Sequence, residues 1–187
     1  VKYLYDLTND YRYLNGFYKN ELNNKWSVHG GVSYTYIQND TWVDDQNIQE
    51  TENGIHAKTV FEGSLSENVE LKTGAEIIQR SYSQRFFIPS GADYDLGFDE
   101  WITAGFGEMD IYASNRFVTR AGVRLEYNNL IHKLSVDPRI SLALKTGGPG
   151  QFSLAYGRFR QSPKNEFLRI DKALGAEKAE HLILNFQ

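Results

Sequence analysis

The sequence has no cysteine, and only 4 prolines and one methionine occur among its 187 residues. Without cysteine, the chain has no disulfide framework, no thiolate zinc site and no cysteine nucleophile. Basic residues are not in excess either, because 20 Lys and Arg stand against 24 Asp and Glu. The chain therefore lacks the positive footprint that nucleic-acid binding requires, and we expect no nucleic-acid partner.

Long apolar runs are also missing. The longest stretch without Asp, Glu, Lys or Arg covers residues 26–39, and polar residues such as His29, Ser33, Thr35 and Gln38 interrupt it. This excludes a transmembrane helix, which needs about 20 predominantly apolar residues. It does not exclude a transmembrane β-barrel, because barrel strands are apolar on one face only.

The sequence is rich in aromatic residues, with 11 Phe, 12 Tyr and 3 Trp, and its apolar residues alternate with polar ones. A content of 41% hydrophobic and 24% charged residues is not that of a disordered chain. The clearest alternation covers residues 26–36, where one face carries Trp26, Val28, Gly30, Val32, Tyr34 and Tyr36. Such a period of two predicts a β-strand with one apolar face.

The same pattern recurs along the chain. It is clear at 117–127 and 134–145, present at 71–79, and weaker at 57–65, 101–111 and 152–156. A poorly defined strand near 16–22 and a last strand from about 181 complete the set. We predict an all-β chain of about eight antiparallel strands.

The connections between these segments alternate in length. Short turns are expected at 23–25, 66–68, 114–116 and 146–150, and the last of these reads Thr-Gly-Gly-Pro-Gly. Long polar loops are expected at 39–54, 83–100 and 161–180, with a shorter one at 128–132. Short turns at one end and long loops at the other are typical of an outer-membrane barrel, with periplasmic turns and extracellular loops.

Aromatic residues mark the two ends of the outward apolar faces. Trp26 and Tyr36 are ten residues apart, which is about 33 Å in a strand and projects to roughly 25 Å at a tilt of about 40°. Phe117 and Tyr127 repeat the spacing. This separation matches the apolar band of a membrane barrel with its aromatic girdles.

The opposite faces are rich in charge. They carry Lys72, Glu76, Arg80, Glu108, Asp110, Arg120, Arg124, Glu126, Asp137 and Arg139. Burying these groups in a narrow closed barrel would be costly, so we favour a wide lumen filled by water or by a polar plug. The solvated side of a sandwich sheet is the alternative. For Glu108 and Asp110 we predict salt bridges with Arg120 or Arg124.

Catalytic and metal sites find little support. The histidines His29, His56, His132 and His181 have no paired ligand spacing, the acidic segment 40–45 lacks the pattern of a calcium loop, and Ser81–Gln84 has no nucleophile-elbow glycines. We predict no enzyme, no catalytic residue, no metal site and no cofactor. Aromatic residues expected in loops are candidates for ligand contact, but the ligand-binding residues stay undetermined: Trp42, Phe86, Phe87 and Tyr94.

The last third of the chain contains motifs that resemble those of a known family. The segment Asp137–Lys145, the glycine-rich turn and the segment Phe152–Pro163 are similar to a "PR-S-AY" and "AYG-F-Q-P" hairpin. Residues 174–187 are similar to an "L-EKA-H-I-NYQ" segment, with Phe186 in place of the usual Tyr, and residues 107–127 are similar to a further hairpin. With these motifs, which cover residues 101 onward, the chain resembles TonB-dependent outer-membrane receptors of the Bacteroidetes type.

The resemblance implies a 22-stranded barrel with an N-terminal plug in its lumen, which imports scarce nutrients with energy from TonB. We therefore expect residues 1–187 to be part of one barrel domain in the outer membrane of a Gram-negative bacterium, an excerpt without the plug and the C-terminal strands. The implied partners are outer-membrane lipid, the plug, the TonB complex and an undetermined ligand, which in this family is an iron chelate, cobalamin, a glycan or a peptide. The alternatives are a small eight-stranded outer-membrane barrel with a structural or adhesive role and a soluble lipocalin-like or sandwich binding module.

Overall fold

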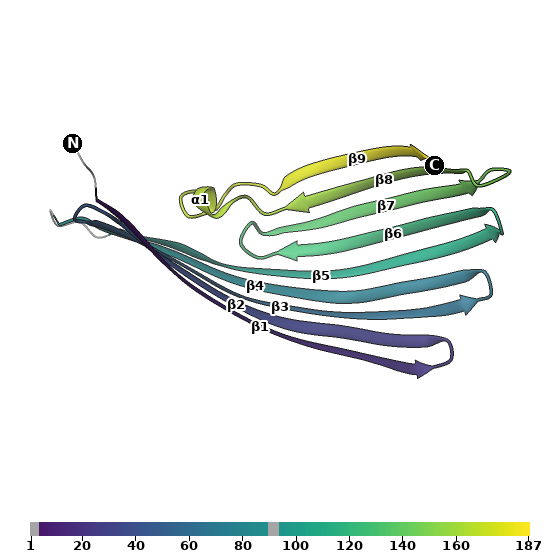
Figure 1. Cartoon of the computed structure of the whole chain (residues 1–187), viewed down its shortest axis with the longest axis horizontal. Helices are drawn as coiled ribbons and strands as arrows, with labels where there is room; N and C mark the ends of the chain where they lie inside the picture. The colour runs from purple at the N-terminus through teal and green to yellow at the C-terminus, as the bar shows by residue number, and fades with distance from the viewer. Residues whose placement is uncertain (1–3, 90–93) are drawn as a thin grey trace.

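The computed structural model describes residues 4–89 and 94–187, and they form one antiparallel sheet whose nine strands follow chain order (Figure 1). The prediction of an all-β antiparallel fold is confirmed, and the weakly predicted strand near 16–22 is part of β1. The strands are β1 (Tyr5–Asn23), β2 (Trp26–Val43), β3 (Gln46–Ser66), β4 (Val69–Phe87), β5 (Tyr94–Ser114), β6 (Phe117–Asn128), β7 (Lys133–Lys145), β8 (Gln151–Gln161) and β9 (Glu177–Phe186).

The first five strands are longer than the sequence predicts, at 18 to 21 residues. Residues 39–54, expected as a loop, form the ends of β2 and β3 with a tight turn at Asp44 and Asp45. Much of 83–100 likewise belongs to β4 and β5, while residues 90–93 of that expected loop lie outside the described residues. These segments lack an apolar outer face, so their alternation is weak although their backbones pair in full.

Three of the short turns share one construction. In each, the strand ends with a register shift, and the residue there caps the turn through its side-chain oxygen. Asn23 Oδ1 accepts from the backbone N–H of Lys25 at 2.8 Å, Ser66 Oγ from that of Asn68 at 3.4 Å, and Ser114 Oγ from that of Phe117 at 3.1 Å. Such Asx and Ser turns replace backbone hydrogen bonds that a tight connection cannot make.

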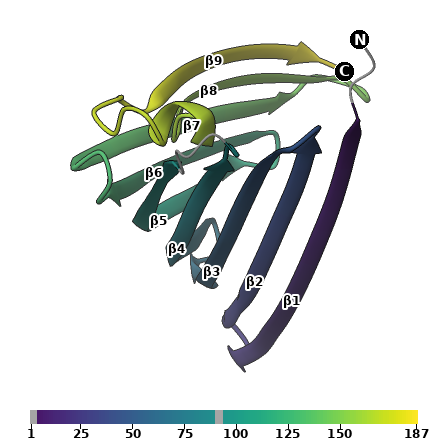
Figure 2. The ribbon, with the colours of Figure 1, turned by 90° about the vertical axis from the view of Figure 1, so that its left-hand side faces the viewer.

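The sheet is strongly curved (Figure 2). Its two faces differ in chemistry. Cross-strand register places a band of apolar side chains on the outward face, and these are exposed: Val32, Tyr34, Ile55, Phe61, Ile77, Trp101, Val123, Leu125, Tyr127, Val136, Ile140 and Leu144. Trp26 and Phe117 stand at the turn end of the band, as the aromatic spacing predicts. Phe152 also stands at this end, since it pairs with Leu144, which pairs with Phe117. Exposed apolar area of this extent indicates contact with lipid or with another apolar surface.

The connection from β8 to β9 is the one predicted long loop that is mostly irregular. It contains a short helix, α1 (Asn165–Leu168), and lies at the end of the sheet away from the short turns (Figure 1). Within the described ranges no helix has the length and apolarity to cross a membrane. We call residues 162–176 the strap, because they fold back onto the inward face, where Leu168 is fully buried against Tyr82, Phe98 and Leu130.

Candidate ligand-binding hollow

The inward face carries the charged residues that the sequence places opposite the apolar band, and most of them are paired. Arg120 Nε lies 2.6 Å from Asp110 Oδ1 and 3.4 Å from Glu108 Oε1, so the predicted salt bridges of these two carboxylates are present. Arg124 bridges Glu76 at 2.5 Å and Glu126 at 2.8 Å. These ion pairs offset the free-energy cost of removing the inward charges partly from water.

Along the strands, the face that carries the apolar side chains changes from the outward face to the inward face. Towards the short turns, apolar side chains point outward, as Tyr34 does on β2. Beyond Tyr36, the next two outward positions of β2 are polar, namely Gln38 and Asp40, which are hydrogen-bonded to each other. There the apolar side chains point inward instead, and they line a hollow: Ile37, Ile78, Tyr82 and Ile102. This phase reversal sets the outer limit of the outward apolar band.

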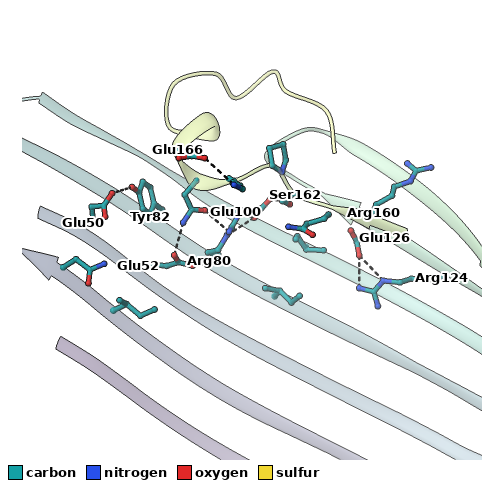
Figure 3. Close-up of a pocket in the computed structure, with 18 residues that line it drawn as sticks. Glu50, Glu52, Arg80, Tyr82, Glu100, Arg124, Glu126, Arg160, Ser162 and Glu166 are labelled. Atoms are coloured by element: carbon teal, nitrogen blue, oxygen red, sulfur yellow. Dashed lines mark hydrogen bonds and ion pairs between the residues drawn. The ribbon is translucent and has the colours of Figure 1, made fainter. Parts of the chain in front are cut away.

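The hollow has a volume of about 970 Å³ and extends from β2 across the sheet to the strap (Figure 3). Its polar lining combines acidic groups with arginines: Glu50, Glu52, Arg80, Glu100, Arg124, Glu126 and Arg160. Small-molecule sites combine apolar surface with convergent polar groups, and in this hollow the polar and charged residues outnumber the apolar ones.

Glu100 is the centre of the polar network in this hollow, and it is only 1% exposed. Its carboxylate accepts two hydrogen bonds from Arg80, at 3.1 and 2.7 Å, and one each from Asn128 and Ser162, both at 2.6 Å. A buried carboxylate is stable only when its oxygens are satisfied in this way. Because Ser162 belongs to the strap, Glu100 joins the sheet to that segment.

Asn165 makes a second connection between the strap and the sheet. Its amide nitrogen donates to Glu52 Oε2, and its amide oxygen accepts from Arg80, each at 2.9 Å. Asn165 and Glu52 are 113 positions apart in the chain. The strap is therefore held over the hollow by polar contacts at Ser162 and Asn165 and by the apolar contact at Leu168.

Tyr82 lies on the inward face beyond the apolar band. Its hydroxyl donates a hydrogen bond to Glu50 at 2.9 Å, and its ring stacks on Phe98 with centroids 5.6 Å apart. Burial and the neighbouring Glu50 carboxylate raise the pKa of Tyr82 to about 12, since both disfavour a phenolate. Tyr82 therefore stays a hydrogen-bond donor at neutral pH.

The histidines are not brought together. His56 pairs with Glu76 at 2.6 Å, His29 lies near Phe17, His181 lies near Phe159, and His132 occupies a turn with φ of 48°. In residues 4–89 and 94–187, no group of three or more His, Cys, Asp or Glu side chains is arranged to hold a metal ion.

The four aromatic residues proposed for ligand contact are spread over two faces. Trp42, Phe87 and Tyr94 are exposed near the strand ends, and Phe86 lies under the Arg169 guanidinium, 5.8 Å from its ring centroid. None of the four lines the hollow.

The polar groups of the hollow lie mostly where the sequence suggests loops. Glu50 and Glu52 fall within the expected loop 39–54, and Ser162 and Asn165 within 161–180. Their convergence depends on cross-strand register and on the path of the strap. A charge every second residue at Glu50 and Glu52 is the one signal of a strand there, and it is too short to be decisive.

Comparison with known proteins gives structural similarity without sequence similarity. No protein-family model matches the sequence, and no curated protein matches it either. Solved structures do match: the copper transporter OprC has a TM-score of 0.80 at 11% identity and aligns with 95% of this chain. The ferric citrate transporter FecA aligns with 96% of this chain, at a TM-score of 0.71 and 10% identity. The siderophore receptor PiuA from Acinetobacter baumannii also aligns with 96% of this chain, at a TM-score of 0.71 and 9% identity.

This chain spans about a third of the length of these structures, with 36%, 32% and 38% of the three covered. The RagAB peptide importer matches as well, with a TM-score of 0.62 at 10% identity. At such identities the likeness concerns the fold. The nine-stranded antiparallel sheet thus shares its fold with part of each of these transporter and receptor structures.

Proposed function

We propose that this chain is part of the barrel domain of an outer-membrane receptor that takes up a scarce nutrient with energy from TonB. Residues 1–187 form one section of a 22-stranded barrel, and a plug domain and further strands complete it. The barrel stands in the outer membrane of a Gram-negative bacterium, and its sequence motifs favour the Bacteroidetes type of the family. The protein acts as a transporter and not as an enzyme.

The observation that carries this proposal is the two-faced sheet. Its outward face is an exposed apolar band with aromatic residues at its ends, and its inward face holds charged residues in ion pairs. A membrane barrel needs this distribution, because lipid faces one side and water or a polar plug faces the other. The similarity to solved transporters and receptors supports the same conclusion.

The nutrient is an iron chelate, cobalamin, a glycan or a peptide. The similar structures are named for copper, ferric citrate, siderophores and a peptide, so the fold serves ligands of different chemistry. The hollow beneath the strap is the place where we expect the ligand to contact this part of the barrel.

The open edges of the sheet count against a closed eight-stranded barrel. Within the described residues there are nine strands, and β1 pairs only with β2 while β9 pairs only with β8. Unpaired edges are not stable within a membrane, so we expect other strands of the full protein to pair with both. The extent of the outward apolar band counts in the same way against a soluble lipocalin-like module.

Membrane fractionation and an uptake assay test the proposal. The full-length protein, produced in a Gram-negative host, is expected in the outer-membrane fraction. Growth on limiting nutrients supplied one class at a time is expected to depend on the receptor and to stop when TonB is deleted. Recovery in the soluble fraction would refute membrane insertion. Uptake that persists without TonB would show a passive channel instead.

A further inference from the structure

We propose that four neighbouring side chains on the inward face bind the primary ammonium group of an organic ligand. They are Glu50 and Glu52 on β3 and Tyr82 and Gln84 on β4, and we call them the β3–β4 square. Register places Glu50 directly opposite Gln84 and Glu52 directly opposite Tyr82. Directly opposed Cβ atoms lie about 5 Å apart, so one small group can contact several of the four.

The β3–β4 square has more acceptors than donors. Tyr82 Oη and Gln84 Nε2 both donate to the same atom, Glu50 Oε1, at 2.9 and 2.6 Å. Glu52 accepts through Oε2 from Asn165. Three oxygens are left without a hydrogen bond from the described side chains: Glu50 Oε2, Glu52 Oε1 and Gln84 Oε1.

The unpaired side-chain oxygen of Gln84 indicates that a hydrogen-bond donor is missing from this site. Gln84 is 5% exposed, and its Oε1 has no hydrogen-bond partner among residues 4–89 and 94–187. Its amide is directed at Glu50, because the amide nitrogen donates to that carboxylate. A buried acceptor without a donor is costly, and a donor arriving beside Glu50 removes this cost.

The charges of the square favour a cation. Neither Glu50 nor Glu52 takes part in an ion pair within the described part of the chain. The nearby Arg80 is committed to Glu100 and Asn165, and Arg169 is engaged with the Phe86 ring and the Glu166 carbonyl. A primary ammonium carries three N–H donors and no acceptor, which matches three free oxygens and two carboxylate charges.

The surroundings define the rest of the ligand. Ile37, Ile78 and Ile102 line the same hollow as Glu50 and Glu52, so an apolar chain or ring attached to the ammonium can lie against them. A calcium ion fits less well, since it takes six to eight oxygen ligands. The inference rests on the proposed function, and it specifies the ligand of that receptor as an amine with an apolar body.

Dansylcadaverine, an aromatic group on a five-carbon chain ending in a primary ammonium, is a suitable probe. Its binding to the full-length receptor in detergent is followed by fluorescence anisotropy. Acetylation of its amine removes the charge and two of the three donors, and we expect binding about tenfold weaker or more. Glu50→Gln and Glu52→Gln are expected to cause a similar loss. Glu67→Gln, in the exposed turn between β3 and β4, is the matched control and is expected to bind as the wild type does.

Several results would overturn the inference. Equal affinity for the acetylated probe would show an apolar site only, and displacement of the probe by calcium chloride at constant ionic strength would show a metal site. An unchanged affinity in Glu50→Gln and Glu52→Gln, with unchanged thermal unfolding, would place the amine elsewhere. The inference also fails if the probe never binds and Arg169→Gln prevents folding, because Arg169 is then the countercharge of Glu50 and Glu52 within the protein. A receptor that reaches the outer membrane and depends on TonB, yet does not bind the probe, refutes this inference alone.

Discussion

Arg80 on β4 and Glu100 on β5 are directly opposite each other, and the Arg80 guanidinium donates two hydrogen bonds to a carboxylate that is 1% exposed. In Arg80→Gln that buried carboxylate loses its countercharge, and we predict a loss of about 3–5 kcal/mol in the free energy of unfolding. Urea unfolding of the full-length protein in detergent measures it.

The same two strands offer a matched control. Arg85 and Asp95 are also directly opposite but lie on the exposed side, with exposed side-chain fractions of 67% and 62%. Arg85→Gln is expected to cost about 1 kcal/mol or less. Equal losses in the two variants would mean that water reaches Glu100 despite the strap.

Leu168 fixes the strap through apolar packing. Leu168→Ala leaves a cavity against Tyr82 and Phe98, and such truncations cost about 2–5 kcal/mol. We predict faster amide hydrogen exchange in residues 162–176, with little change in the paired strands. Ile170→Ala is the control, because Ile170 is 74% exposed. Uniform acceleration over the whole sheet would show that the strap is not a separate unit.

Tyr82 makes the stability of the sheet depend on pH at the end that lies beneath the strap. Its pKa is raised to about 12 in the folded protein, above the ordinary value of about 10. The stabilisation is therefore complete below pH of about 10 and is lost as the pH rises towards 12. The difference in tyrosinate absorbance between wild type and Tyr82→Phe, recorded as pH rises, is expected to have its midpoint near 12. A midpoint near 10 would show that Tyr82 is solvated.

Adjacent residues on β2 test the two faces of the band. Val32 points outward and is 52% exposed, and Ser33 points inward. An arginine facing lipid near mid-depth costs about 2–4 kcal/mol, so we predict a clear drop in folded receptor in the outer membrane for Val32→Arg. Ser33→Arg is expected to be better tolerated, because its side chain enters a polar lumen. Quantitative blotting of outer-membrane fractions compares them, and a larger drop for Ser33→Arg would reverse our assignment of the faces.

The sequence predicts the strands of the outward apolar band well, because strands with one apolar face require alternation. Residues 117–127 and 134–145 lie in β6 and β7 almost end to end. At residues 39–54 the sequence predicts a loop, because the alternation disappears where the outer face is polar, although β2 and β3 continue there. The pairing of Arg120 with Asp110 was predictable from strand faces. The contact of Asn165 with Glu52 was not, since it depends on where an irregular segment folds back.

The phase reversal along β2 to β5 fixes how the hairpins can slide past one another. In a strand with one continuous apolar face, a slip by two residues keeps every side chain on its own face, so alternation alone does not prevent it. Here a slip by two residues moves the phase reversal of one strand relative to that of its neighbours. Ile37 or Ile78 then lies beside the part of the neighbouring strand that belongs to the outward apolar band. The reversal therefore disfavours register slips by an even number of residues as well as by an odd number. It fixes the register of each hairpin relative to its neighbours.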